Sequence, residues 1–162
     1  MSTSASKVLL KGQEIVSNRE EIITILNQAL AGEGLASYLF LYFSKAVSGR
    51  GAHEVGEILT SLAVSEQTHV SEIMERIIQL GGEPLRSPSD WEKTTYCKFT
   101  PPKINATPRE AVEECTRLER EAILFYQDLA HKTQHSDYVT FQLVSRILAE
   151  EVADEHKLTN AQ

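Results

Sequence analysis

The chain has 162 residues, of which 41% are hydrophobic and 24% are charged, and its formal net charge is −7. This length and composition are ordinary for one globular domain with a single core, and they exclude a largely disordered chain. A surface for duplex DNA needs clustered Lys and Arg side chains that displace counterions from phosphate, and the sequence has no such cluster. DNA binding is therefore not expected.

Hydropathy and cysteine content bear on the cellular compartment. No apolar run approaches the roughly 20 residues that would cross a bilayer, and the first six residues lack the charged start and apolar stretch of a signal peptide. Two cysteines do not make a disulfide framework, so a reducing compartment is the default. We therefore expect a cytoplasmic protein without a membrane partner.

The first half of the chain predicts a helical hairpin. Apolar residues recur at helical spacing from about Arg19 to about Val47, and two glycines then interrupt the pattern. A second helix is expected from about His53 to the Gly-Gly pair at 81–82.

A long segment without helical periodicity follows the hairpin. Residues 82–106 contain four prolines, and a loop of about 25 residues inside one domain must have work to do or distance to cover. It predicts a crossover that runs the length of the domain. Thr107 then reads as a helix cap, with Pro108 in the first helical position and Glu110 completing a capping box.

The second half of the chain predicts another hairpin. The third helix is expected to end near His131, and the fourth to run from 136–137 to about Leu158. We therefore predict an all-α four-helix bundle of two antiparallel hairpins joined by a long crossover. Residues 1–18 are assigned to an N-terminal tail and residues 19–160 to the bundle domain.

Acidic residues interrupt the apolar stripe of every helix. A lone buried carboxylate is costly, and several that converge repel one another unless cations lie between them. Carboxylate and imidazole ligands suit iron, manganese or zinc, so the pattern predicts a site for two metal ions. The residues that interrupt the stripes are Glu33, Glu66, His69, Glu119, Glu151 and Asp154.

The spacing of these residues supports convergence. Glu66 and His69 are three positions apart and share a helix face. Glu33 precedes Glu66 by 33 residues and Glu119 precedes Glu151 by 32, as a pseudo-repeat would. Any one such glutamate alone is more often a solvated or salt-bridged side chain, so the prediction depends on the set.

Other ionisable residues compete as ligands. Asp128 and His131 also form a carboxylate-x-x-His pair, but Asp128 lies about 180° around the helix from Glu119 and is expected to point outward. Glu121 and His156 are expected at or near the surface. The residues that stay open as alternative ligands are Glu150 and Glu155.

Five segments together form a recognisable family pattern, namely residues 31–33, 65–69, 78–84, 117–123 and 146–151. They resemble the bacterioferritin and ferritin superfamily, and within it the Dps-like group intermediate between bacterioferritins and starvation-induced DNA-protecting proteins. The resemblance implies a ferritin-like bundle with a di-iron ferroxidase centre. The implied iron ligands are Glu33, Glu66, His69, Glu119 and Glu151.

The sequence departs from the family pattern at three places. Asp154 stands where a histidine is expected, so one metal subsite is weaker, retuned, or served by Glu155 or water. Gln67 stands where bacterioferritins place a haem-binding methionine, so no haem is expected. The chain stops soon after the fourth helix, which favours a homo-oligomeric shell of 12 subunits over one of 24.

Three further residues have open roles. Members of the Dps-like group resemble this chain in having one cysteine in the crossover and one in the third helix, here Cys97 and Cys115. A redox pair and two separate buried thiols both remain open. Tyr38 is expected either to support Glu33 or to pack in the core.

The resemblance implies oxidation of Fe(II) by hydrogen peroxide or oxygen, with Fe(III) sequestered in the shell. One alternative is a rubrerythrin-like di-iron peroxidase, although the sequence lacks the Cys-x-x-Cys pair of a rubredoxin site. A second is a DNA-coating stress-protection protein, against which the acidic charge argues. A third is a structural bundle with fortuitous carboxylates.

Overall fold

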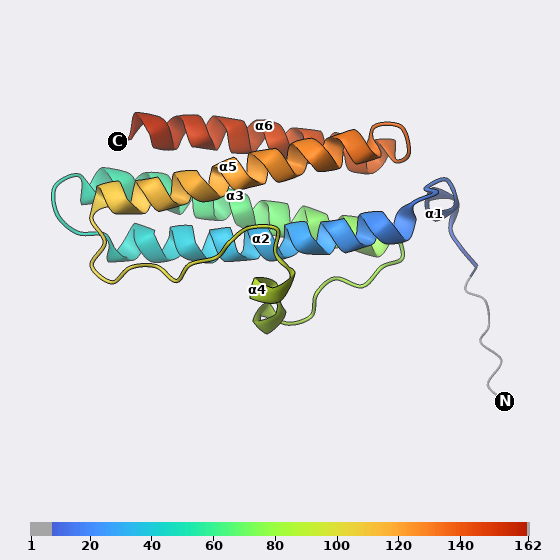
Figure 1. The fold of residues 1–162 in the computed structure, drawn as a ribbon, viewed down its shortest axis with the longest axis horizontal. Helices are drawn as coiled ribbons and strands as arrows, with labels where there is room; N and C mark the ends of the chain where they lie inside the picture. The colour runs from blue at the N-terminus through green and yellow to red at the C-terminus, as the bar shows by residue number, and fades with distance from the viewer. Residues whose placement is uncertain (1–7, 162) are drawn as a thin grey trace.

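A computed structural model describes residues 8–161 of the chain. Among these residues there are helices and no strands, and the long helices lie side by side (Figure 1). The long helices are α2 (Arg19–Ala46), α3 (Ala52–Gln79), α5 (Pro108–Thr133) and α6 (Tyr138–Asn160). The short elements are α1 (Lys11–Glu14), the 3₁₀ turn η1 (Pro88–Asp90) and α4 (Trp91–Thr94).

The long helices form two antiparallel pairs. Helix α2 packs along α3, and α5 packs along α6. The crossover leaves α3 at one end of the bundle and runs back along its side to α5 at the other end (Figure 1). The predicted all-α bundle of two hairpins is confirmed. The crossover also contains η1 and α4. The segment assigned to the N-terminal tail contains α1, and residues 1–7 of that segment lie outside the described part of the chain.

Local sequence signals explain where the helices begin and end. Thr107 and Glu110 form the predicted capping box, because each side chain accepts a hydrogen bond from the other residue's backbone N–H. Helix α3 ends in a Schellman motif, in which Gly82 N–H donates to the Ile77 carbonyl at 2.9 Å. Gly81 adopts a φ of 80°, a conformation that glycine takes without steric cost.

The core is divided into two apolar clusters with a polar layer between them. One cluster contains Leu26 from α2 and Ile77 from α3, together with the second half of α5 and the first half of α6. The other contains Phe40 from α2 and Leu59 from α3, together with the start of α5 and the end of α6. The predicted acidic positions lie between these clusters on every helix, so each acidic side chain has apolar packing on both sides along the bundle.

The crossover packs against the middle of α2. A Cβ added at Gly34 would lie 2.6 Å from a ring carbon of Trp91, and one added at Gly32 would overlap the ring of Tyr96. Tyr96 in turn stacks on Phe125 of α5 with ring centroids 4.1 Å apart. The two glycines therefore allow the aromatic side chains of the crossover to lie directly on the helix backbone beside Glu33.

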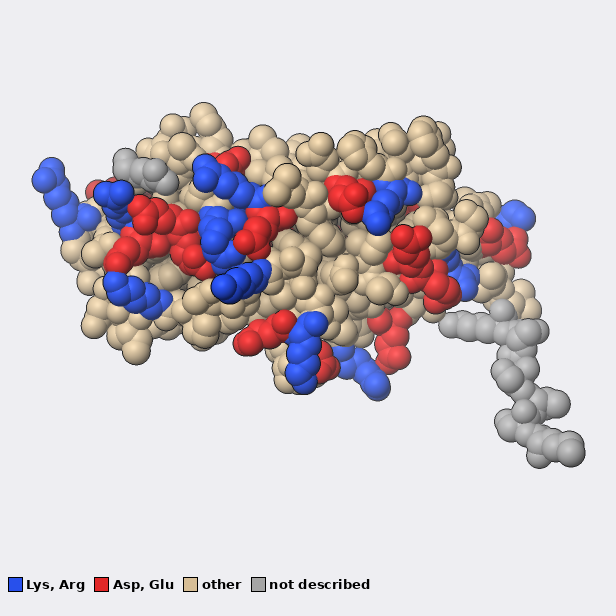
Figure 2. All heavy atoms as spheres, viewed as in Figure 1, with Lys and Arg blue, Asp and Glu red and all other residues tan. Residues whose placement is uncertain are grey.

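Two surface properties bear on partners. Within residues 8–161, no helix combines the length and apolar character needed to cross a membrane. Figure 2 shows that Lys and Arg side chains on one face are interspersed with Asp and Glu side chains, without a continuous basic area among the described residues of that face.

Candidate metal centre

The six residues singled out in the sequence converge in the polar layer. Each is at most 3% exposed, and together they come from all four long helices. Their ligand atoms form two groups, and within each group these atoms lie within 4.8 Å of one another. The first group is Glu33, Glu66, His69 and Glu151, and the second is Glu66, Glu119 and Asp154. Because Glu66 belongs to both, the arrangement is that of two adjacent sites sharing one carboxylate.

His69 presents its two ring nitrogens to different surroundings. Nδ1 faces the first group, at 3.2 Å from Glu66 Oε2, 3.2 Å from Glu151 Oε1 and 3.4 Å from Glu33 Oε2. Nε2 lies 2.7 Å from Glu150 Oε2 on the opposite side. Burial by itself lowers the pKa of His69, but the three carboxylates outweigh it and raise that pKa far above its ordinary value.

Burial and mutual repulsion change the pKa of the carboxylates in the centre. Burial raises the pKa of Glu66, Glu119 and Glu151, and the charges of neighbouring carboxylates raise it further. Glu33 is the exception, because hydrogen bonds from Glu66, His69 and a tyrosine outweigh its burial and lower its pKa. A divalent cation between these groups would relieve the repulsion that one imidazole balances only in part.

The unpaired polar atoms, the space between them and the types of donor atom indicate whether these residues could bind metal ions. Glu119 Oε1 is buried and accepts no hydrogen bond, and the buried Glu151 Oε1 faces His69 Nδ1 at 3.2 Å. A buried carboxylate oxygen without a partner is costly unless a positive group takes the place of water. A cavity of about 10 Å³ lies between the carboxylates, roughly the room that one water molecule needs. Carboxylate oxygens with one imidazole nitrogen suit iron, manganese or zinc. The residues therefore fit a pair of such ions.

Two aromatic residues at the centre were not predicted from the sequence. Tyr126, two turns after Glu119 on α5, donates its hydroxyl hydrogen to Glu33 Oε1. Tyr96 of the crossover lines the small cavity. Tyr38, which was expected to support Glu33 or pack in the core, is instead 57% exposed, so that prediction is wrong. The position of Tyr126 on the apolar stripe of its helix is the sequence feature that could have predicted its burial near the acidic residues.

The alternative ligands have other partners. Glu155 accepts a hydrogen bond from Arg120 at 2.6 Å, and Glu150 binds the far nitrogen of His69. Glu121 pairs with Arg117 at 2.5 Å. Asp128 and His156, which were expected at the surface, are exposed, and so is His131.

Both cysteines are buried and free in the structure. Cys97 lines the small cavity, and its Sγ lies 3.1 Å from Thr95 Oγ1. Cys115 packs in the apolar cluster one turn before Glu119. Burial raises the pKa of both thiols, so the two sulfurs are in their protonated, less reactive form at neutral pH.

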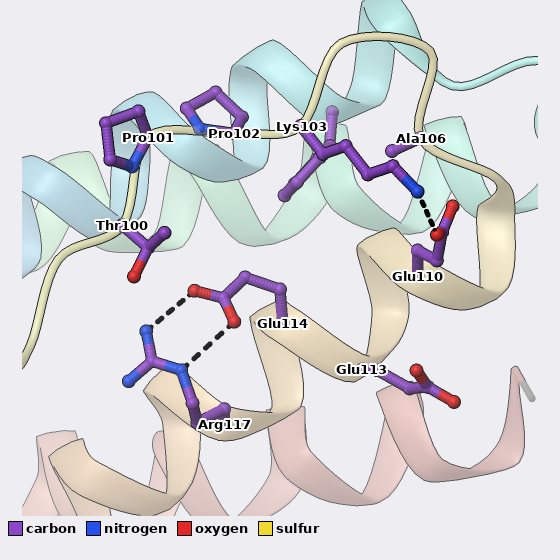
Figure 3. Close-up of a pocket in the computed structure, with 10 residues that line it drawn as sticks. Thr100, Pro101, Pro102, Lys103, Ala106, Glu110, Glu113, Glu114 and Arg117 are labelled. Carbon is purple, nitrogen blue, oxygen red and sulfur yellow. Dashed lines mark hydrogen bonds and ion pairs between the residues drawn. The ribbon is translucent and has the colours of Figure 1, made fainter.

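A separate cleft of about 320 Å³ lies between the crossover and the start of α5. Figure 3 shows two ion pairs in the cleft, Lys103 with Glu110 and Arg117 with Glu114. The remaining charged side chain, Glu113, pairs with Arg109. These pairs leave their charges satisfied inside the cleft, and the cleft contains none of the six residues of the centre. We assign no ligand to it.

The fold and the shared two-site centre together define a ferritin-like protein. A family model for the ferritin-like domain matches residues 23–161, so the chain belongs to the ferritin-like family. The resemblance read from the sequence segments is thereby confirmed.

Three known proteins are similar to this chain over most of its length. A solved structure described as a dodecameric thioferritin, the bacterioferritin-related protein of Bacteroides fragilis, is 31% identical with a TM-score of 0.87 and covers 93% of this chain and 88% of its own. The DNA protection during starvation protein of Pyrococcus furiosus is 24% identical over 136 residues, which is 84% of this chain and 74% of that protein. Dps from Thermosynechococcus elongatus is 18% identical with a TM-score of 0.83, covers 91% of this chain and 93% of its own, and supports the fold alone.

Proposed function

We propose that this protein is a ferroxidase that oxidises Fe(II) at the two-site centre and sequesters Fe(III) in a homo-oligomeric shell. The observation that carries the proposal is the pair of buried groups that share Glu66, in which Glu119 Oε1 lacks a hydrogen-bond partner. Family membership supports iron as the metal.

The residues of the centre have distinct roles in this reaction. The substrate is two Fe(II) ions. Glu66 would bind both of them, and His69 would bind the ion of the first group through Nδ1. Two Fe(II) ions supply two electrons, which with two protons reduce one hydrogen peroxide to two waters or one oxygen to hydrogen peroxide. The apolar clusters on both sides of the layer exclude bulk water, so the anionic residues act on the ions at low dielectric, where their attraction is strong.

Sequestration requires an enclosed space, which one bundle does not provide. The bacterioferritin-related protein of Bacteroides fragilis is described as dodecameric. We propose that this chain likewise assembles into a shell of 12 subunits, with the oxidised iron retained inside.

The double variant Glu66→Ala/His69→Ala tests the assignment. It removes the shared carboxylate and the only imidazole of the centre, so rapid Fe(II) oxidation should fall by about 100-fold or more while helical content persists. Stopped-flow absorbance of Fe(III) and circular dichroism provide the two measurements. An oxidation rate equal to that of the unmodified protein would refute the proposal.

A matched control lies on the same helix. His53 and Glu57 form an exposed pair, with Nε2 and Oε1 3.6 Å apart, outside the centre. His53→Ala/Glu57→Ala should oxidise Fe(II) at the unmodified rate. Size-exclusion chromatography after Fe(II) loading then separates the alternatives, since co-elution of iron with a large particle supports storage and iron turnover by a small species supports a peroxidase.

A further inference from the structure

The crossover forms one wall of the small cavity at the metal centre. Tyr96 and Cys97 are the crossover residues that line it, and the other lining residues all belong to the four long helices. The cavity has room for about one water molecule, so a larger molecule reaches the carboxylates only when a wall moves. The packed helices are held by the core, and the crossover is therefore the wall that can move most easily.

Few contacts attach this wall to the bundle. Within residues 86–106, Cys97 and Ala106 are the buried residues, and the rest are exposed or half-buried. The hydrogen bonds that join this segment to the long helices involve only the Lys98 backbone and the Lys103 side chain among the described residues. A segment with so few contacts opens at a lower free energy than the whole domain unfolds.

Two side chains of α5 bind the backbone of Lys98, directly after the cavity wall. Glu121 Oε2 accepts from the Lys98 N–H at 3.0 Å, and Arg117 Nη2 donates to the Lys98 carbonyl at 2.8 Å. Arg117 also pairs with Glu121 at 2.5 Å, so each of these side chains orients the other. Because Lys98 follows Cys97 in the chain, these contacts fix the end of the wall.

We propose that residues 91–98 form a lid over the metal centre, and that Arg117 and Glu121 are positioning residues that keep it closed. The lid opens while the four long helices stay folded, and it admits small neutral molecules to the cavity. It thereby favours hydrogen peroxide over bulkier hydroperoxides. This inference rests on the proposed function for the kind of molecule admitted, whereas the motion of the lid does not depend on it.

The thiol of Cys97 reports on the lid without any metal. Methyl methanethiosulfonate is a small neutral reagent that transfers its methylthio group to a thiolate, and peptide mass spectrometry distinguishes Cys97 from Cys115. Glu121→Ala removes the acceptor of the Lys98 N–H, so Cys97 should react about three- to tenfold faster. Cys115 is fully buried in the apolar cluster and should keep its slow rate, because only unfolding of the bundle exposes it.

A second substitution at the same position separates the loss of the hydrogen bond from the loss of charge. Burial and, to a lesser extent, the charge of Glu121 raise the pKa of Cys97, so removing that charge alone makes the thiol more reactive. Glu121→Gln removes the same charge but keeps an amide oxygen that can accept from the Lys98 N–H. Its Cys97 should therefore react clearly more slowly than that of Glu121→Ala.

A matched control lies on the same helix. Glu113 pairs with Arg109 near the start of α5 and makes no hydrogen bond to the crossover among the described residues. Glu113→Ala should leave the Cys97 rate unchanged.

Selectivity between two hydroperoxides gives a readout in the reaction itself. Each hydroperoxide takes two electrons from two Fe(II) ions and two protons, which breaks its O–O bond and yields water with either a second water or tert-butanol. tert-Butyl hydroperoxide is too bulky for the closed cavity, so the unmodified protein should use it much more slowly than hydrogen peroxide. Glu121→Ala should raise the ratio of the tert-butyl hydroperoxide rate to the hydrogen peroxide rate by about threefold or more, whereas Glu121→Gln should change it little.

The contrary outcomes are distinct for the lid and for the proposed function. Equal Cys97 rates in Glu121→Ala and the unmodified protein, or in Glu121→Ala and Glu121→Gln, would overturn the lid even if Fe(II) oxidation is normal. An equal acceleration of Cys115 would also overturn it, because the whole bundle would then have loosened. Absence of Fe(II) oxidation in the unmodified protein would instead overturn the proposed function, and the Cys97 rates would still decide whether the lid exists.

Discussion

Both ring nitrogens of His69 contact carboxylates, and the carboxylate at Nε2 belongs to a network of charged residues near the surface. Glu150 accepts from Nε2 at 2.7 Å and also accepts from Arg146 at 2.8 Å. Arg146 donates in turn to Glu72 at 2.5 Å, which ties α6 to α3. These contacts lower the pKa of Glu150, although its burial opposes the change. With Nε2–H committed to Glu150, a metal ion that displaced the Nδ1 proton would find the lone pair of Nδ1 directed at the first group.

Glu150 therefore should influence metal binding without being a ligand. Glu150→Ala should weaken metal binding at the His69 group by about 10- to 100-fold, because the ring loses its orientation and its anionic acceptor. Glu150→Gln should lose less, since its amide oxygen can still accept from Nε2–H. Co(II) titration against a competing chelator measures the change.

Glu155 offers the matched control for this prediction. It lies five residues further along α6 and pairs with Arg120 instead of His69. Glu155→Ala should leave Co(II) affinity unchanged. Equal affinities for Glu150→Ala and the unmodified protein would show that His69 does not need this contact.

At the scale of elements, a buried ion pair joins the end of α3 to the start of α6. Arg76 donates to both carboxylate oxygens of Asp137 at 2.9 Å, and to Thr140 Oγ1 at 2.8 Å. Asp137 also caps α6 by accepting from the Thr140 N–H at 3.1 Å. A helix start at 136–137 was expected from the sequence, whereas the partner on α3 was not, because no local pattern relates residues 61 positions apart.

Asp137→Asn should destabilise the fold by about 3 kcal/mol at neutral pH, because it leaves the Arg76 charge buried without its counter-ion. Hydrogen bonds, chiefly from Thr140 and Arg76, outweigh burial and lower the pKa of Asp137 below its ordinary value of 3.8. A lowered pKa stabilises the fold above 3.8, and this contribution disappears as the pH falls through the folded-state value. The difference between the two proteins should therefore shrink below pH 3.8 in denaturant titrations.

Asp128→Asn provides the comparison at a surface position of α5. Its side chain is largely exposed and pairs with Lys132 at 3.6 Å. The substitution should change the free energy of unfolding by no more than about 0.5 kcal/mol. A similar loss in both variants would mean that the buried pair contributes no more than a surface charge.

At the scale of the whole molecule, the polar layer exists because two apolar clusters enclose it. Leu30 and Ile73 bound it on one side, and Leu62 and Leu118 on the other. These clusters supply the packing that compensates for several buried acids in the middle of the bundle. The centre is therefore a property of the assembled bundle and of no single helix.

Assembly is the property to measure at this scale. Light scattering coupled to size-exclusion chromatography should give a particle of roughly twelve times the 18.1 kDa of one chain. A monomer or dimer at micromolar concentration would contradict the proposed shell, because sequestered Fe(III) needs an interior. The result is independent of whether the centre oxidises iron.

The sequence by itself determined the helices, their order and the acidic positions. Helical periodicity, the Thr107 capping box and the Gly81 terminus are local features, so neighbouring residues are enough to specify them. The interruption of each apolar stripe by acids is likewise readable along one helix. The six candidate ligands could therefore be predicted and are brought together in the structure.

Only the tertiary structure decided which side chains surround these acids. The Tyr126 hydroxyl at Glu33, the Glu150 contact to His69 and the crossover ring of Tyr96 depend on how separate helices rotate and approach. Side-chain contacts across such distances follow from packing, which no local period encodes.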